Sequence, residues 1–285
     1  MHFSLAILLC ILALAALLIA AKVLGAIRWS KQGELLRQQL AQGSNGDATD
    51  HVDFEQLGQL PDSVQVFFRA ALQDRQKTII AARMVQHGQL NLGSGKERWK
   101  PFVSDQLVTT TKPGFDWNAI VTLFPGLVVN VRDAYINGSG ILRAALQGLI
   151  EVGHTEGPGE IAEGELMRFL AEAAWYPTAL LPSSGVSWEQ LGSRSAQATL
   201  IDHGHRAILL FEFNTDGLIE TVTAEQRGRL VGKQLVPTPW RGRFWNYAER
   251  DGMQVPLQGE VAWIVDGMPK PYWRGHLDRI EYTLT

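Results

Sequence analysis

The segment at residues 164–177 constrains the fold most, because it is strongly helical and lies between two long regions with the character of strands. Pro177 lacks an amide hydrogen and disfavours helical geometry in the residue before it, which predicts a helix end near Trp175. Small and apolar side chains cover most of the helix surface, so we expect it to lie inside the fold. Its main apolar face has the spacing of a helix and consists of Leu166, Phe169, Leu170 and Ala173.

One charged line runs along this helix and consists of Glu165, Arg168 and Glu172, spaced so that they neighbour one another. Two interpretations stay open. The line is either a solvated stripe, in which each ion pair contributes roughly 0.2–0.5 kcal/mol, or Arg168 and Glu172 are buried together beside a cavity. In the buried case, removing one partner costs on the order of 3–5 kcal/mol.

Residues 3–21 are an unbroken apolar run, long enough to cross the hydrocarbon core of a membrane as a helix. A cleaved signal peptide is the alternative, but no Lys or Arg precedes the run. Basic residues follow it, and the positive-inside rule then predicts a cytoplasmic globular domain. These basic residues are Lys22, Arg28, Lys31 and Arg37.

The sequence therefore divides into an anchor at 1–27, a juxtamembrane helix and linker at 28–59, and one globular domain at 60–285. Residues 30–42 predict a short polar helix, and the Gly- and Ser-containing stretch 43–50 has the composition of a flexible linker. The globular domain is expected to begin with a helix at 63–72, where Pro61 suits the start.

From residue 79 onward the apolar pattern has period two and is interrupted by close turns, among them Asn137-Gly138 and Asp266-Gly267. Such spacing favours an antiparallel meander of about ten strands over β-α-β units. Residues 141–152 fit either a strand or a short helix, and 153–159 are expected to be a loop. The fold class is α+β: a curved antiparallel sheet, similar to a half-barrel, that cups the central helix and follows one transmembrane helix.

Composition narrows the classes of function. The chain has 285 residues, is 46% hydrophobic and carries a net charge of −3, which gives no general attraction for nucleic acid. Its single cysteine, Cys10, excludes disulfides and cysteine-based zinc sites within the chain. Nine tryptophans are many for this length, and they are expected in core edges, pockets or interfaces.

The sequence contains no clear catalytic or cofactor-binding motif. No phosphate-binding loop occurs, and Gly138-Ser139-Gly140 lacks the third glycine of a dinucleotide fingerprint. His203 and His205 flank a hairpin tip and are expected to be solvated, so no metal site and no cofactor is predicted.

Two acids, Asp116 and Asp133, interrupt apolar strands. They either face outward or converge with Arg168, Glu172 and further arginines, Arg241 and Arg274, in a cavity. The full set of predicted ligand-binding residues is Arg168, Glu172, Trp175, Trp117, Asp116, Asp133, Tyr135, Trp240, Trp273 and Arg274.

The central helix, written G-E-L-x-R-F-L-A-E-x-x-W-x-P-x-A-L-L-P over 164–182, resembles the signature of a bacterial membrane-anchored family described only as a domain of unknown function. Other features are similar, such as Pro113-x-Phe115-x-Trp117 and Tyr272-Trp273-Arg274-Gly275. The resemblance covers nearly all of the chain from Leu60. It implies no activity, but it suggests that Arg168, Glu172 and Trp175 matter together.

Three hypotheses of function follow. The first is a membrane-anchored protein that binds a lipid or other hydrophobic ligand in an aromatic-lined cleft, a shape similar to the half-barrels of lipoprotein carriers. The second is an enzyme that uses Arg168 and Glu172 with Asp116 or Asp133. The third is a structural or interaction module with a filled core.

Overall fold

A computed structural model describes residues 2–43, 51–93, 95–232 and 234–285. The expected linker at 43–50 lies almost wholly outside these residues. The helices are α1 (His2–Gly43), α2 (Asp62–Ala71) and α3 (Glu160–Glu172), and the short 3-10 turns are η1 (Gln56–Gln59), η2 (Ala173–Trp175), η3 (Pro177–Leu180) and η4 (Pro182–Ser184). The strands are β1 (Ile79–Asn91), β2 (Trp99–Thr109), β3 (Gly114–Phe124), β4 (Leu127–Ile136), β5 (Ser139–Leu146), β6 (Ile150–Gly157), β7 (Ser187–Gly192), β8 (Ser195–Asp202), β9 (His205–Phe213), β10 (Ile219–Val231), β11 (Gln234–Arg250), β12 (Met253–Val265) and β13 (Met268–Leu284).

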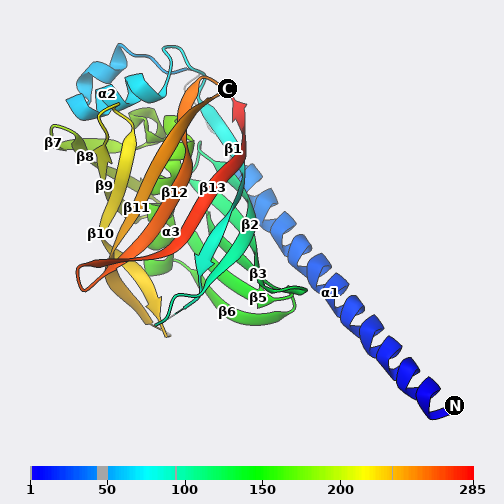
Figure 1. The fold of residues 1–285 in the computed structure, drawn as a ribbon. Coiled ribbons are helices and arrows are strands. Elements are labelled where there is room, and N and C mark those ends of the chain that lie inside the picture. Colours follow the sequence, from blue (N-terminus) through cyan, green and yellow to red (C-terminus); the bar gives the residue numbers. More distant parts are fainter. Residues whose placement is uncertain (1, 44–50, 94, 233) are drawn as a thin grey trace.

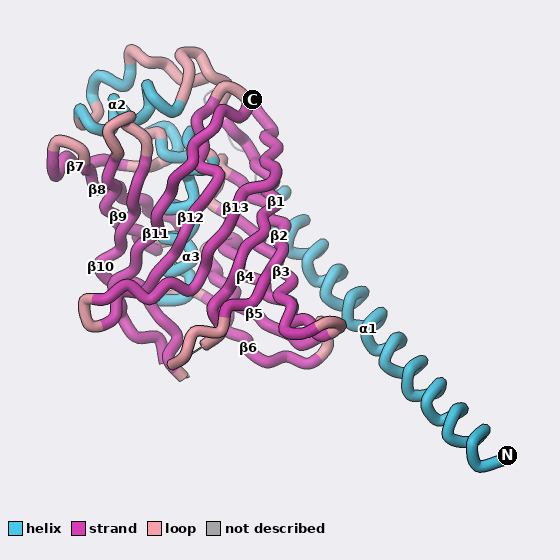
Figure 2. Tube along the Cα trace, viewed as in Figure 1, coloured by secondary structure: helices cyan, strands magenta, loops and turns pink. Residues whose placement is uncertain are grey.

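All of these strands form one antiparallel sheet of thirteen strands that curves around α3, as Figures 1 and 2 show. The order is β6-β5-β4-β3-β2-β1-β13-β12-β11-β10-β9-β8-β7, so the two halves of the chain meet where β1 pairs with β13. The segment that contains α3 leads from one edge strand, β6, to the other, β7. The predicted fold class is confirmed: the chain is α+β, with a curved antiparallel sheet that cups a central helix.

The core lies between the concave face of the sheet and α3. Leu166 and Leu170 are fully buried there, and the α-helix ends at Glu172 before one 3-10 turn carries the chain to Trp175, close to the predicted end. The Tyr176 hydroxyl donates to the Phe169 carbonyl at 2.7 Å and ties the turn back to the helix. Of the two interpretations of the charged line on α3, the solvated stripe is wrong, since Glu165, Arg168 and Glu172 are all largely buried.

Three strand predictions need correction. Residues 141–152 are not one element: β5 and β6 are joined by a turn in which Gln147 has a positive φ. β6 extends to Gly157 through the expected loop, and β7 was not predicted. Both β6 and β7 are edge strands with mostly exposed side chains, so neither carries the apolar alternation that identifies a half-buried strand.

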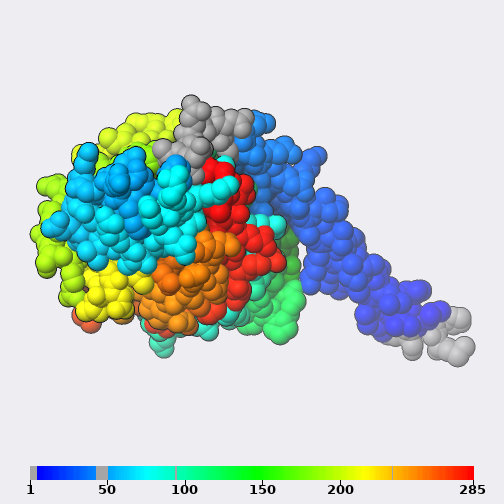
Figure 3. All heavy atoms as spheres, turned by 90° about the horizontal axis from the view of Figure 1, so that it is seen from above, coloured from blue at the N-terminus to red at the C-terminus, as the bar shows by residue number. Residues whose placement is uncertain are grey.

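Helix α1 joins two segments that were expected to be separate. It continues from the apolar run through the polar segment without a break. Over Leu5–Gln42 this helix is long enough and apolar enough to span a membrane. Its apolar half projects away from the sheet in Figure 1, and Figure 3 shows the same projection from above. Trp29 and Leu40, in its second half, are buried against the convex face of the sheet.

Candidate functional site

A cavity of about 290 Å³ lies between α3 and the concave face of the sheet. The sheet contributes most of the aromatic side chains of its lining, and charged side chains come both from α3 and from the sheet. The side chains that matter below come from α3, from η2 and from six strands: Trp117, Asp133, Glu165, Arg168, Glu172, Trp175, Arg227, Trp240, Trp263, Tyr272 and Trp273.

Glycines shape the aromatic wall. Gly88, Gly275 and Gly259 lie in one row across β1, β13 and β12. A Cβ atom on Gly275 would lie 2.2 Å from Trp273 Cη2, so the indole of Trp273 covers the backbone of Gly275. Because the glycines of this row have no side chains, the indole of Trp273 has space to lie over the backbone. The rings of Trp175 and Phe102 pack beside this indole.

The indole nitrogens of the wall differ in their partners. Trp175 Nε1 donates to the Pro256 carbonyl at 2.8 Å, and Trp240 Nε1 donates to the Tyr272 hydroxyl at 3.0 Å. Among the described residues, Trp117 Nε1 and Trp273 Nε1 are buried without a hydrogen-bond acceptor. A buried donor of this kind costs free energy unless something accepts from it.

Arg168 organises the charged wall. Its Nη1 atom lies 2.7 Å from Asp133 Oδ2, and its Nε atom lies 2.7 Å from Glu172 Oε1. Gln106 donates to the other oxygen of Glu172 at 2.7 Å. The guanidinium also lies 4.9 Å from the ring centroid of Trp117, so its planar face meets an aromatic ring while its edges meet carboxylates.

A second, looser ion pair lies beside the first. Arg227 Nη2 is 3.4 Å from Glu165 Oε1, and the guanidinium stacks 5.1 Å from the ring centroid of Trp240. Glu165 Oε2 is buried and has no hydrogen-bond donor among the described residues.

Burial dominates the electrostatics of this wall. It raises the pKa of Glu165 to about 7, against the opposing charge of Arg227, and it raises the pKa of Asp133 against the opposing charge of Arg168. Burial would lower the pKa of Arg168, but the carboxylates of Glu172 and Asp133 outweigh it and raise that pKa. Arg168 is thus a permanent cation, whereas Glu165 changes charge near neutral pH.

Seven of the ten predicted site residues line this cavity. They are Arg168, Glu172, Trp175, Trp117, Asp133, Trp240 and Trp273.

The other three do not line it. Asp116 lies on the convex face, fully buried under α1, where it pairs with Arg37 at 2.8 Å and with Arg132 at 3.0 Å. Tyr135 donates to Asp202 Oδ2 at 2.6 Å, between β4 and β8. Arg274 lies on the convex face and pairs with Glu260 at 2.7 Å. Strand alternation accounts for Asp116 and Arg274, since each directly neighbours a tryptophan that faces the cavity.

Several cavity residues were not predicted. Glu165 belongs to the charged line of α3, and its spacing from Arg168 was the available signal. Arg227 and Trp263 carried no signal, because they come from strands that only the curvature of the sheet brings to α3. Tyr272 belonged to the Tyr272-Trp273-Arg274-Gly275 feature that resembles the family, but that resemblance did not place it in the site. Arg241, which the sequence also offered for the cavity beside Arg274, does not line it either.

The chain is similar to one family of proteins and to several solved structures. A family of unknown function, DUF6920, matches residues 58–282. No curated protein matches the chain. A solved LolA superfamily protein from Nitrosomonas europaea is similar over 77% of this chain and 92% of its own, with 8% identity and a TM-score of 0.40. A DUF1329 family protein from Desulfovibrio piger is similar over 77% of this chain and 91% of its own, with 12% identity and a TM-score of 0.38.

Proposed function

We propose that this chain, which belongs to the DUF6920 family of unknown function, binds an amphiphilic molecule in the cavity between α3 and the sheet. The observation that carries the proposal is that one cavity has an aromatic wall and is lined by residues with buried polar atoms that lack a hydrogen-bond partner among the described residues. Ligand sites are typically apolar cavities with a few placed polar groups. A filled core would leave neither the space nor the unpartnered atoms.

The lining indicates the chemistry of the ligand. The indole nitrogens of Trp117 and Trp273 suit an acceptor such as a carbonyl oxygen, and Glu165 Oε2 suits a hydroxyl or amine. A volume of about 290 Å³ lies near the lower end of the range of roughly 300–1,000 Å³ for small-molecule pockets. The size supports one acyl chain or a comparable apolar group rather than a complete multi-chain lipid.

Helix α1 supports a membrane as the source of this ligand. Lys22 Nζ donates to the carbonyl of Gly126, in the β3–β4 turn, at 2.8 Å, so the apolar residues before Lys22 project beyond that turn. The strand ends that lead into the β1–β2, β5–β6, β10–β11 and β12–β13 turns lie at the same end of the sheet in Figure 1. Large exposed apolar side chains cluster at this end: Leu92, Phe124, Ile150, Leu230, Val231 and Met268.

The cavity lies toward the same end. Leu90, Leu230 and Trp263 line it, and each is close to a strand end that leads into one of these turns. Basic side chains such as Lys96, Arg98 and Lys270 accompany the apolar tips and suit an anionic lipid surface. In this proposal α1 anchors the chain and the hairpin tips meet the bilayer, from which the ligand enters.

The proposal keeps the expected division into an anchor at 1–27, a juxtamembrane segment at 28–59 and a globular domain at 60–285. It also places the globular domain in the cytoplasm, because basic residues follow the apolar run. If the domain is cytoplasmic, a fluorescent protein fused to the C-terminus should be bright. If that fusion is dark, and a reporter that works only after secretion is active at the same position, the assignment is reversed.

The test is to fill the cavity. Gly164 faces it from α3, and a Cβ atom there would meet only Arg227 Nε, at 3.7 Å, an ordinary contact. Gly164→Leu therefore adds a side chain to the cavity and also removes a glycine from a helix interior, which favours the fold by up to about 1 kcal/mol. Gly153→Leu is the matched control, since a Cβ at Gly153 meets nothing within 4 Å.

Both variants and the wild-type chain would be purified in detergent, and their organic extracts compared by mass spectrometry. We expect an apolar or amphiphilic compound, in stoichiometric amount, with the wild type and with Gly153→Leu but not with Gly164→Leu. Equal amounts in all three would mean that the compound comes from the detergent belt around α1. No compound in the folded wild type would argue against tight binding.

Acid–base catalysis is a second candidate function, favoured by one observation. Glu165 has a pKa of about 7, which is the range in which a carboxyl exchanges protons most usefully at neutral pH, and it lies in the cavity beside a permanent cation. Turnover of the extracted compound by wild type and not by Glu165→Gln would support catalysis, whereas unchanged compound in both would leave binding alone.

A further inference from the structure

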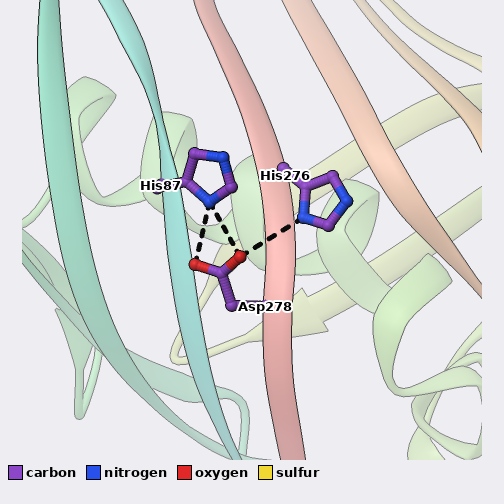
Figure 4. A group of neighbouring side chains, drawn as sticks. All are labelled: His87, His276 and Asp278. Carbon is purple, nitrogen blue, oxygen red and sulfur yellow. Dashed lines mark hydrogen bonds and ion pairs between the residues drawn. The ribbon is translucent and has the colours of Figure 1, made fainter.

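A group of three potential metal ligands lies on the convex face of the sheet, away from the cavity. His87 comes from β1, and His276 and Asp278 come from the paired strand β13. Figure 4 shows both imidazole rings beside the single carboxylate of Asp278, on the side of the strands that is turned away from α3. Their neighbours on β1, Met84 and Gln86, are buried on the other side, so the group faces solvent.

The three side chains converge closely. His87 Nδ1 lies 2.8 Å from Asp278 Oδ1 and 2.9 Å from Oδ2, and His276 Nδ1 lies 3.4 Å from Oδ1. One ligand atom of each residue falls within 4.8 Å of the others. Bonds of about 2.0–2.2 Å from nitrogen and oxygen to a zinc-sized ion place ligand atoms at comparable mutual distances.

The backbone is arranged to produce this convergence. His87 and His276 are directly paired across the two strands, and their rings stack with centroids 5.1 Å apart. The pairing then slips, from Gln86 opposite Leu277 to Val85 opposite Arg279, so Asp278 is the extra residue of a β-bulge. Bulges re-aim side chains and occur often at functional sites.

We propose that His87, His276 and Asp278 bind a divalent first-row transition-metal ion. Two imidazole nitrogens and one carboxylate form a ligand set suited to zinc or to iron, cobalt and nickel, and three protein ligands leave coordination positions free. A shallow groove lined by His87, His276, Gln258 and Trp245 runs beside the group, so the free positions face space in which water or a small anion fits. The site is separate from the proposed amphiphile cavity and does not depend on it.

The competing explanation is a surface ion pair. Asp278 and His87 are more than a third exposed, and exposed ion pairs contribute little to stability, with a median of about 0–1 kcal/mol. An ion pair needs one imidazole, however, whereas here two stacked imidazoles turn the same kind of nitrogen, Nδ1, toward one carboxylate. A shared cation gives both rings a reason for this orientation.

His154 serves as a control, because it also lies near carboxylates but in an arrangement that does not suit a metal ion. Its Nδ1 faces Glu151 at 3.4 Å and its Nε2 faces Glu156 at 3.1 Å. Because the two nitrogens lie on different sides of the ring, one ion cannot bind both carboxylates and this imidazole together. His154→Ala is therefore expected to leave metal binding unchanged.

The experiment is a titration of the untagged full chain in detergent with Zn²⁺ by calorimetry, and with Co²⁺ by visible absorption. We expect one ion per chain, with visible bands typical of bound Co²⁺. His87→Ala, His276→Ala and Asp278→Asn should each weaken binding by at least about tenfold, whereas His154→Ala should retain it.

All four substitutions are at partly or fully exposed positions, and far-UV circular dichroism would verify their folds. An affinity that is the same in wild type and in all three ligand variants would overturn the proposal, as would no uptake of either ion by the folded wild-type chain. Binding of several ions per chain that survives the three substitutions would identify adventitious surface sites and would overturn it as well.

Discussion

Arg168 on α3 lies 2.7 Å from Asp133 on β4 through its Nη1 atom, and this contact fixes the central helix to one half of the sheet. The same guanidinium pairs with Glu172 one turn later on α3. The two contacts leave Arg168 with 13% of its side chain exposed, so the charge is held inside the fold by its partners rather than by water.

Arg168→Ala should destabilise the chain strongly. The substitution leaves Asp133 and Glu172 buried without their cation, and breaking a buried pair in this way costs on the order of 3–5 kcal/mol. Denaturant unfolding followed by tryptophan fluorescence measures the loss. Arg274→Ala is the matched control: that arginine is half exposed and its pair with Glu260 lies at the surface, so a change within about 1 kcal/mol is expected. Equal losses in the two variants would contradict the buried role of Arg168.

Glu165 should make stability depend on pH. Its pKa in the folded chain is about 7, above its ordinary value of 4.5, so the folded state binds this proton more tightly than the unfolded state does. The resulting stabilisation is complete below pH 4.5 and is lost as the pH rises toward 7, with about 1.4 kcal/mol for each tenfold difference in proton affinity.

Glu165→Gln cannot titrate and isolates this effect. The free energy of unfolding of the wild type should fall relative to that of the variant between about pH 4.5 and 7, and the difference should level off above that range. Unfolding curves measured at closely spaced pH values give the comparison. Two parallel pH profiles would mean that folding leaves the pKa of Glu165 at its ordinary value.

Asp116→Asn should loosen α1 from the sheet. Asp116 is fully buried between Arg37 of α1 and Arg132 of β4, so the neutral side chain leaves two guanidiniums without their shared anion. We expect a loss on the order of 3–5 kcal/mol and faster amide hydrogen exchange in the second half of α1.

Arg83→Ala is the control for this network. Arg83 pairs with Asp105 at the edge of the same cluster but is 52% exposed, so its removal should change stability by no more than about 1 kcal/mol and leave exchange in α1 unaltered. Unchanged exchange in Asp116→Asn would show that the apolar contacts of Trp29 and Leu40 hold the helix by themselves.

Gly275→Ala should displace the indole of Trp273. The added Cβ would lie 2.2 Å from the ring, which is too close for any real contact, and overpacking of this kind costs about 1–3 kcal/mol. Thermal unfolding and the tryptophan emission spectrum should both change. Gly58→Ala, where a Cβ meets nothing within 4 Å, should change neither. An unaltered emission spectrum in Gly275→Ala would mean that the ring has another position available.

Local patterns in the sequence determined most elements of this fold, but not the edge strands β6 and β7, whose mostly exposed side chains lack an apolar alternation. The apolar spacing around Leu166 and the stop at Pro177 specify α3, and turns such as Asn137-Gly138 and Asp266-Gly267 specify hairpins, because each depends only on residues that are near in sequence. A helix between two sets of hairpins then leaves few arrangements other than a sheet around it, which is why the fold class was predictable.

Only the tertiary structure decided which side chains meet. Alternation along β3 places Asp116 and Trp117 on opposite faces, but it does not say which face is concave or that α1 covers the other. Arg227 reaches Glu165, and His87 reaches His276 and Asp278, through the curvature of the sheet and the pairing of β1 with β13. These contacts join residues far apart in the chain, and strand register, which sets them, depends on the whole sheet rather than on any local pattern.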